Sequence, residues 1–288
     1  MVGSETKRSE PMNENPARRD IPAVVFFDVD GTLIWHDPAA NAAQNVANAR
    51  PSEGVARAFA RLRERGHLTF ICTGRPRNLV SDDLLALEPT GLVTSAGACV
   101  NMGGETVYEK VIDPELLERT VRWLTSAGAE VLFEGSSCLA ALMPNGGVYT
   151  DIPGAVTVRS WDELRGSTDL RFSKFSYTSD TFPVIATMPD DLRCEYGFYD
   201  LGLGAGETGM KGVDKAYGVR RVLDRLGRGT ERTFAFGDSE NDLPMLDAVE
   251  TAVAMGNAME VVKQRADYMT DPVADDGVVS GLAHFGLI

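Results

Sequence analysis

The sequence predicts an α/β protein whose core is a doubly wound, mostly parallel sheet, interrupted by an inserted α+β module. Two observations predict this class. Short buried runs alternate with amphipathic helical stretches from residue 22 to about residue 97, and the same alternation returns from about residue 213 to the C-terminus. Such alternation favours parallel strand pairing with right-handed crossovers. The pattern between the two regions is mixed, as expected of an insert.

The first half of the predicted core contains three buried strands. Residues 23–27 form a β-branched and aromatic run, residues 68–72 form a second apolar run, and residues 92–93 lie in a third. Ser52 is placed to cap an amphipathic helix between the first two strands, and a helix opened by Pro76 separates the second strand from the third. This segment is therefore expected to run strand, helix, strand, helix, strand.

The remaining elements are predicted by the same rules of periodicity. A hairpin is expected around Gly103, a capped helix begins at Asp113, and short strands follow at 130–133 and 171–177. The second half of the core is predicted as a helix at 213–226, a strand at 233–236, a helix at 241–249, a strand at 251–255 and helices at 258–266 and 277–285. We therefore expect a flexible tail at 1–21, a core at 22–111 and 198–288, and an α+β insert at 112–197.

The charge and the composition argue against several classes of partner. The 288 residues include 28 Lys and Arg and 42 Asp and Glu, a net charge of −14, which repels a nucleic-acid backbone. Uninterrupted apolar stretches of about five residues fall far short of the ~20 that span a bilayer. The four cysteines form no C-x-x-C pair and the N-terminal segment contains no apolar signal region, which favours a reducing cytoplasm. No feature of the sequence indicates an oligomeric state.

Polar residues follow three of the predicted parallel strands, at the edge where ligands collect in doubly wound sheets. They are Asp28, Asp30 and Gly31 after the first strand, Thr73 and Gly74 after the second, and Asp238, Asn241 and Asp242 after the strand at 233–236. Because carboxylates brought this close repel one another, several must be protonated or must share a cation. Ligands that are all oxygen indicate a hard ion, with Mg²⁺ as the natural candidate and Ca²⁺ suited to a more flexible cage.

A magnesium ion held by two carboxylates keeps coordination positions for waters and for one substrate oxygen, commonly that of a phosphate. Thr73 and the backbone amides after it are placed to hold further phosphate oxygens. A lysine would complete the neutralisation of the phosphate. Lys215, near the start of the helix that leads into the strand at 233–236, is the best placed, and Lys211 is the rival.

These motifs, in this order, resemble those of the haloacid-dehalogenase-like (HAD) superfamily, and in particular its Cof-type phosphatases. The resemblance is carried by Asp28-x-Asp30-Gly31-Thr32, Thr73-Gly74-Arg75, Lys215 and Gly237-Asp238-x-x-Asn241-Asp242, and by the C-terminal signatures Met255-Gly256-Asn257-Ala258, Ala266-Asp267-Tyr268 and Asp276-Gly277-Val278. It implies a Rossmann-like core, and the insert matches a type 2 cap domain by position. Where the family usually has Asn-Gly-Ala, this chain has Ala96-Gly97-Ala98, so a polar contact from the first of these side chains is unavailable.

The resemblance also implies a two-step phosphoryl transfer through an aspartyl-phosphate. Asp28 would be the nucleophile, while Asp30 would protonate the leaving alcohol and then take a proton from water. Mg²⁺ would be bound by Asp28, Asp238 and the backbone carbonyl of Asp30, with Asp242 in support. The phosphoryl group would be held by Gly31, Thr73, Gly74 and Lys215, and Asn241 would orient the lysine or the phosphate.

We therefore expect a cytoplasmic, Mg²⁺-dependent phosphatase of small phosphomonoesters, with sugar phosphates as the class that the resemblance implies. Its partner would be a small phosphorylated metabolite rather than a nucleic acid or a membrane. Two alternatives remain: a phosphomutase or phosphotransferase, in which an acceptor sugar takes the phosphoryl group, and a non-catalytic ligand-binding regulatory protein. The four intact carboxylates argue against the second. A dehalogenase is disfavoured because Asp30 supplies an acid that a halide leaving group does not need.

Overall fold

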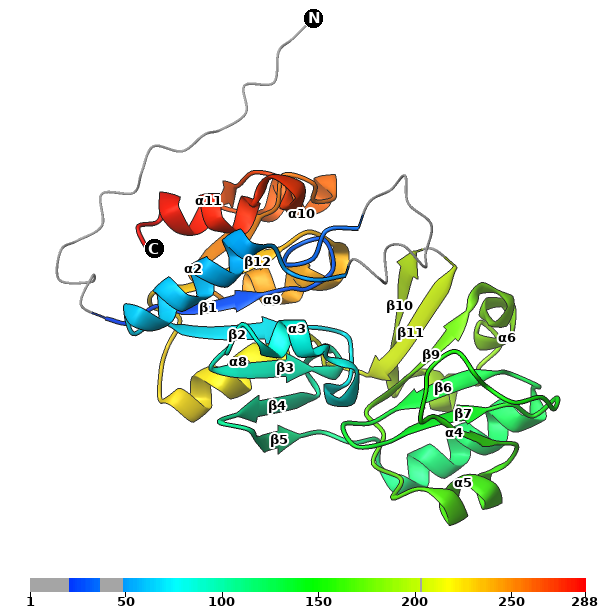
Figure 1. Ribbon diagram of the computed structural model, residues 1–288. Helices are drawn as coiled ribbons and strands as arrows, with labels where there is room; N and C mark the ends of the chain where they lie inside the picture. Colours follow the sequence, from blue (N-terminus) through cyan, green and yellow to red (C-terminus); the bar gives the residue numbers. More distant parts are fainter. Residues whose placement is uncertain (1–20, 37–48, 203) are drawn as a thin grey trace, which may run out of the picture.

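A computed structural model of the chain describes residues 21–36, 49–202 and 204–288. All but the last residue of the tail predicted at 1–21 lie outside the described residues. The described chain contains two sheets that lie apart from one another and are joined by two connections (Figure 1). Within the described part of the chain, no helix combines the length and the apolar character needed to cross a membrane.

The first sheet has eight strands, of which six are parallel. Its order is β14 (Tyr268–Met269), β13 (Thr251–Ala254), β12 (Thr233–Gly237), β1 (Val24–Phe27), β2 (Leu68–Cys72), β3 (Gly91–Thr94), β4 (Cys99–Met102) and β5 (Glu105–Glu109). The hairpin of β4 and β5 adds antiparallel strands at one edge. This topology confirms the predicted doubly wound core, and it places β1 between β12 and β2, the strands that precede the predicted motifs.

Helices cover both faces of the first sheet (Figure 1). On one face, α2 (Glu53–Glu64) contacts α11 (Gly277–His284). On the other face, α8 (Lys215–Leu226) contacts α9 (Leu243–Asp247). A further helix, α10 (Glu260–Arg265), follows β13 and contacts it. Ser52 caps α2 as predicted, since its side chain accepts a hydrogen bond from the Val55 N–H at 3.0 Å. The burial of strands β1 and β12 on both faces explains their continuous apolar sequences.

One helix differs from its prediction. After Pro76 the chain forms a 3₁₀ turn, η2 (Arg77–Leu79), and then a single short helix, α3 (Asp82–Leu85). The cause is Val80, which is buried and extended between the two elements and so interrupts the helical backbone.

The second sheet has six strands, mostly antiparallel. Its order is β10 (Tyr196–Gly202), β11 (Ala205–Met210), β9 (Lys174–Thr178), β6 (Val131–Glu134), β7 (Leu139–Leu142) and β8 (Val156–Val158). Its helices are α4 (Pro114–Ser126), α5 (Trp161–Ser167), α6 (Phe182–Ile185) and α7 (Asp190–Arg193). One sheet face, which carries Phe133 and Phe175, shares a hydrophobic core with α4 and α5.

The predicted boundary at residue 198 does not coincide with the boundary between the sheets. Strand β10 pairs with β11, and β11 pairs with β9, so both strands belong to the second sheet, although the sequence assigned residues from 198 onward to the core. The chain returns to the first sheet only at α8. The strand signal was weak because β11 contains Gly206 and Gly209, and glycine is depleted in strands. The pairing with β9 outweighs that low local propensity.

The other face of the second sheet is turned toward the first sheet. Leu132, Leu139 and Ala141 on this face form a small apolar cluster, and Leu79 of η2 packs against it. Because η2 follows directly on the Thr73-Gly74-Arg75 motif, this face of the second sheet lies beside a predicted part of the site.

A close glycine contact fixes α8 against the end of β3. Gly97 has φ +98°, and a Cβ there would lie 1.9 Å from the Asp214 carbonyl oxygen at the start of α8. Gly218, one turn into the helix, would place a Cβ 2.9 Å from the Gly97 Cα. The helix that carries Lys215 therefore lies as close to the sheet as it does because both positions lack a side chain.

Replacing Gly97 by Ala should therefore destabilise the protein by roughly 3 kcal/mol or more in chemical denaturation, because it adds a collision to the strain of a left-handed backbone. The matched control is Gly103→Ala, at φ +58° with nothing within 4 Å, which carries only the backbone strain of about 1 kcal/mol. Equal losses in the two variants would contradict the close-contact explanation.

Candidate active site

The site begins at the end of β1, in the middle of the first sheet. Asp28 follows Phe27 directly, its backbone N–H donates to the Phe236 carbonyl at 3.0 Å, and its side chain is buried. Because β1 is paired with β12 on one side and β2 on the other, Asp238 and Thr73 leave the sheet at the same edge. The topology thus brings together residues about 200 positions apart, as the sequence predicted for this edge.

Three carboxylates converge at this edge. Oxygen atoms of Asp28, Asp238 and Asp242 all lie within 4.8 Å of one another. Asp242 ends the 3₁₀ turn η5 (Glu240–Asp242), where its Oδ2 accepts hydrogen bonds from the backbone N–H groups of Asp238 at 2.9 Å and Ser239 at 3.0 Å. Its Oδ1 therefore remains directed toward the cluster. We call these three residues the aspartate cluster.

Lys215 supplies the positive charge inside this cluster. Its Nζ donates to Asp28 Oδ1 and to Asp242 Oδ1, both at 2.5 Å, and only 2% of the residue is exposed. It is the first residue of α8, whose N-cap is Asp214. Lys211, the rival from the sequence, is exposed and lies before the helix. The geometry therefore favours Lys215.

The turn around Gly31 holds the Asp238 carboxylate in place, and Asn257 supports this turn. Gly31 has φ +90°, and a Cβ there would lie 2.3 Å from Asp238 Oδ2, so only glycine admits this approach. Thr32 Oγ1 donates to Asp238 Oδ1 at 3.0 Å. Asn257, from the C-terminal signature, donates from Nδ2 to the Gly31 carbonyl at 2.9 Å and accepts at Oδ1 from the Val273 N–H at 2.8 Å. This C-terminal signature therefore positions the first motif.

The cluster carries more negative than positive charge in a buried place. Burial, with Asp242 second, raises the pKa of Asp238 to about 7. Burial and then Asp242 also hold the pKa of Asp28 well above its usual value, although Lys215 opposes this. Burial disfavours the charge on Lys215, yet Asp242 and Asp28 outweigh it and raise the pKa of the lysine. An all-oxygen donor set with excess negative charge fits a hard divalent cation.

The remaining predicted residues lie around the cluster. Thr73 is buried at the end of β2, where its Oγ1 accepts from the Arg75 N–H at 3.1 Å, and Gly74 follows it. Asn241 accepts a hydrogen bond at Oδ1 from the Ser239 hydroxyl at 2.7 Å, a contact that does not reach Lys215. The structure thus brings Asp28, Asp238, Asp242 and Lys215 into one contact network and places Thr73 and Gly74 on the neighbouring strand end.

Asp30 has two side-chain partners, Arg75 and His36, that the sequence did not reveal. Its Oδ1 lies 2.6 Å from Arg75 Nη2 and 2.8 Å from His36 Nε2, and its side chain is 45% exposed. The position of Arg75 directly after Thr73-Gly74 was an available signal. His36 gave none, because a lone histidine in a loop has no distinctive pattern. Both residues are therefore candidates for orienting Asp30.

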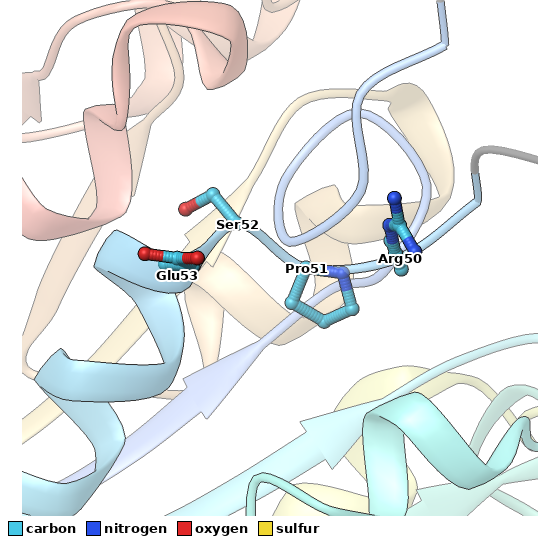
Figure 2. A pocket seen from close by; sticks show the side chains of 4 residues that line it. All are labelled: Arg50, Pro51, Ser52 and Glu53. Atoms are coloured by element: carbon cyan, nitrogen blue, oxygen red, sulfur yellow. The ribbon is translucent and has the colours of Figure 1, made fainter.

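A separate pocket of about 550 Å³ lies where the chain enters α2. Figure 2 shows its described lining residues, Arg50, Pro51, Ser52 and Glu53, in the segment that leads into the first turn of that helix. Ser52 donates its hydroxyl to Asp276 Oδ1 at 2.5 Å, which ties α2 to the start of α11. These lining residues include none of the predicted site residues.

The haloacid dehalogenase-like hydrolase family model matches residues 25–282. The chain belongs to this family. The match confirms the predicted membership in the HAD-like superfamily and the prediction that the chain is an enzyme. It spans both sheets, so it includes the insert as well as the aspartate cluster.

Several known proteins are similar to this chain over nearly its whole length. The Bacillus subtilis protein YkrA is 27% identical over 279 residues, which cover 92% of this chain and 98% of YkrA. The 5-amino-6-(5-phospho-D-ribitylamino)uracil phosphatase YitU of the same organism is 27% identical over 282 residues, covering 92% of this chain and 97% of YitU. The structure of BT4131, a HAD subclass IIB sugar phosphatase, aligns with a TM-score of 0.72 at 25% identity over 92% of this chain and all of that one. Phosphatase names among the relatives support a phosphoric monoester hydrolase.

The stability of the metal-free protein should fall as the pH rises from about 4 toward about 7. In the folded state the pKa of Asp238 is about 7, against an ordinary value of 3.8 for an aspartate. The folded state therefore binds a proton at Asp238 more tightly than the unfolded chain does. The stability that this proton contributes is lost as the pH rises through about 7. Mg²⁺ competes with these protons, so it should raise Tm more at about pH 8.5 than at about pH 5.5, by roughly 5 °C or more at saturating metal.

Calorimetry with and without Mg²⁺ at both pH values measures this effect. The control is Asp238→Asn, which removes one titrating ligand and should lose most of both the pH dependence and the Mg²⁺ effect. A Mg²⁺-induced rise in Tm that is the same at both pH values, or unchanged in the variant, would rule out a cation at the aspartate cluster.

Proposed function

We propose that the protein is a Mg²⁺-dependent phosphatase that hydrolyses small phosphomonoesters, with sugar phosphates as the main class, through an aspartyl-phosphate on Asp28. The observation that carries this proposal is the buried contact of Lys215 with both Asp28 and Asp242, with Asp238 within ligand distance of the two acids. A phosphoryl group needs cationic neighbours and an adjacent nucleophile, and this arrangement offers both. The phosphatase name of YitU and the sugar phosphatase BT4131 support the substrate class.

The proposed reaction has two steps. The Asp28 carboxylate attacks phosphorus, and the bond from phosphorus to the leaving oxygen breaks while Asp30 protonates that oxygen. Asp30 then takes a proton from a water that attacks the phosphorus of the aspartyl-phosphate, which releases phosphate and restores Asp28. Asp30 suits this exchange because it is half-exposed, whereas Asp28 is buried. Arg75 and His36 would orient its carboxylate.

The other residues of the site would hold the phosphoryl oxygens. Lys215 lies against the nucleophile and would neutralise part of the phosphate charge, and Thr73 with the backbone amides of Gly74 and Gly31 would donate hydrogen bonds. Asn241 would orient the lysine or the phosphate. Asp28, Asp238, Asp242 and the backbone carbonyl of Asp30 would hold Mg²⁺. When bound, this ion supplies the positive charge that keeps the acids ionised and offsets charge on the phosphoryl group.

The insert would act as a cap that covers the phosphoryl site. We propose that the second sheet and its helices form this cap, which extends the insert predicted at 112–197 to the end of β11. Its face with Leu132 already lies against η2 of the core. A cap in this place could exclude water and select the leaving group of a small phosphorylated metabolite in the cytoplasm.

Asp28→Asn should reduce phosphate release from a panel of phosphomonoesters by about a thousandfold or more, because an amide cannot form the acyl phosphate. The measurement is free phosphate, with Mg²⁺ and with a chelator, together with a thermal melt that shows the variant is folded. Phosphate released by the wild type without an added acceptor distinguishes hydrolysis from transfer to a sugar. Full activity in the variant would refute the nucleophile, and binding of phosphate without turnover by the wild type would favour a regulatory protein.

Lys215→Met should lower kcat by roughly a hundredfold, because the buried ammonium contacts the nucleophile and would contact the transferring group. Lys211→Met is the matched control, since it makes the same change at an exposed position four residues earlier. Its kcat should stay within about twofold of the wild type. Similar losses in both variants would mean that general charge, rather than the contact with Asp28, governs the rate.

A further inference from the structure

A second buried ionic cluster lies in the second sheet, outside the aspartate cluster. Lys174 of β9 forms ion pairs with Glu207 of β11 and, at 3.2 Å, with Glu134 of β6. Each of the three residues is no more than 5% exposed. Two carboxylates share one ammonium, so the group carries one excess negative charge when all three are ionised. We call it the Glu–Lys–Glu cluster.

Strand register places this cluster on the face turned toward the first sheet. Glu134 is paired with Lys174, and Glu207 is paired with Ser176, two residues along the same strand from Lys174. Leu132 is also paired with Ser176, and it belongs to the apolar group against which Leu79 of the core packs. The cluster and the contact with the core are therefore on one face.

The cluster lies directly beside the phosphate-binding loop. Glu207 Oε2 is 3.6 Å from the position that a Cβ would take on Gly74. Gly74 follows Thr73 at the end of β2, the strand paired with β1, which ends at Asp28. Glu207 therefore faces the loop at which we propose that the phosphoryl group is held.

A hollow lined by both apolar and polar residues lies on the second sheet along the same strands. A pocket of about 300 Å³ is lined by residues that include Glu130, Leu132, Tyr149, Asp151, Ser176 and Thr178. Glu130 and Leu132 precede Glu134 at spacings of two, and Ser176 and Thr178 follow Lys174 at the same spacing. Leu132 and Ser176 of this hollow share the face of the Glu–Lys–Glu cluster, while Val131 and Tyr177, which also line it, occupy the alternate positions. Its polar lining offers carboxylates and hydroxyls, with no cationic side chain among those named.

Packing alone does not account for this cluster. Burying an ion pair costs desolvation that apolar residues of the same volume would avoid, so stability alone does not explain the cluster. The carboxylates of Glu134 and Glu207 can each accept more hydrogen bonds than Lys174 provides, and hydroxyl groups are suitable donors. An anion on a leaving group would instead meet excess negative charge with little solvent to screen it.

We propose that Glu207, with Glu134 and Lys174, is the specificity-determining group for the leaving alcohol: it selects neutral polyhydroxylated phosphomonoesters and rejects those with a second anionic group. The inference rests on the proposed phosphatase function and deepens it. Glu207 is the central member because it is nearest to Gly74. Lys174 pairs with both carboxylates and holds them in place, and is a positioning residue.

The test compares two open-chain substrates that differ in charge at the end remote from the phosphate. Sorbitol 6-phosphate has a neutral leaving group and 6-phosphogluconate has a carboxylate there. The wild type should prefer the first in kcat/KM by at least about tenfold, and Glu207→Gln should reduce that preference roughly tenfold, mainly through KM. The ratio of the two kcat/KM values does not depend on the fraction of active enzyme, so partial misfolding of a variant does not affect it.

Two further variants complete the experiment. Glu134→Gln should lower the preference in the same direction, and Glu115→Gln, an equal charge change at an exposed position on α4, should leave it unchanged. The inference would be overturned if the wild type showed no preference, or if both cluster variants kept it. In either case, release of phosphate by the wild type would still support the phosphatase assignment. Failure of the wild type to release phosphate from these substrates and from p-nitrophenyl phosphate would overturn both.

Discussion

The site depends on one buried ammonium that contacts two carboxylates. Lys215 is paired with Asp28 and Asp242, while Asp238 lies close to both, so three acids meet a single lysine. In a buried place this excess of negative charge is unfavourable, and it is relieved by protons or by a cation. The raised pKa values of Asp28 and Asp238 express that condition. A divalent ion would remove it, and a phosphoryl dianion could then enter a protein whose net charge is −14.

The rest of the core brings these four side chains together. The four side chains enter from three segments: Asp28 from the end of β1, Asp238 and Asp242 from the turn after β12, and Lys215 from α8. Close approach of these elements requires residues without side chains, because a Cβ on Gly31 or Gly97 would collide with Asp238 or with the start of α8. The site is therefore assembled by backbone packing, and the charges are held at distances that isolated loops would not maintain.

Much of this arrangement follows from the sequence, because strand ends and helix starts are local signals. Asp28, Thr73 and Asp238 were predictable as neighbours once their strands were recognised as parallel. Three features were not predictable. The pairing of Asp30 with His36 depends on the path of a loop. The extension of the second sheet through β11 depends on strand pairing that outweighs the low strand propensity of its glycines. The Glu–Lys–Glu cluster depends on the register of three strands that are distant in the chain. Each is a tertiary effect, set by pairing rather than by local pattern.

The two buried ionic clusters differ in a way that matters for selectivity. The aspartate cluster has carboxylate oxygens within 4.8 Å of one another, close enough to share one small ion, and its charge is thereby reversible. In the Glu–Lys–Glu cluster both acids pair with Lys174. Two acids face one cation there, so one negative charge is left over when all three groups are ionised. Under the proposed selectivity, an anion would be accepted at Asp28 and refused at Glu207, so one acidic protein would bind a phosphate group and still distinguish the charge of the alcohol attached to it.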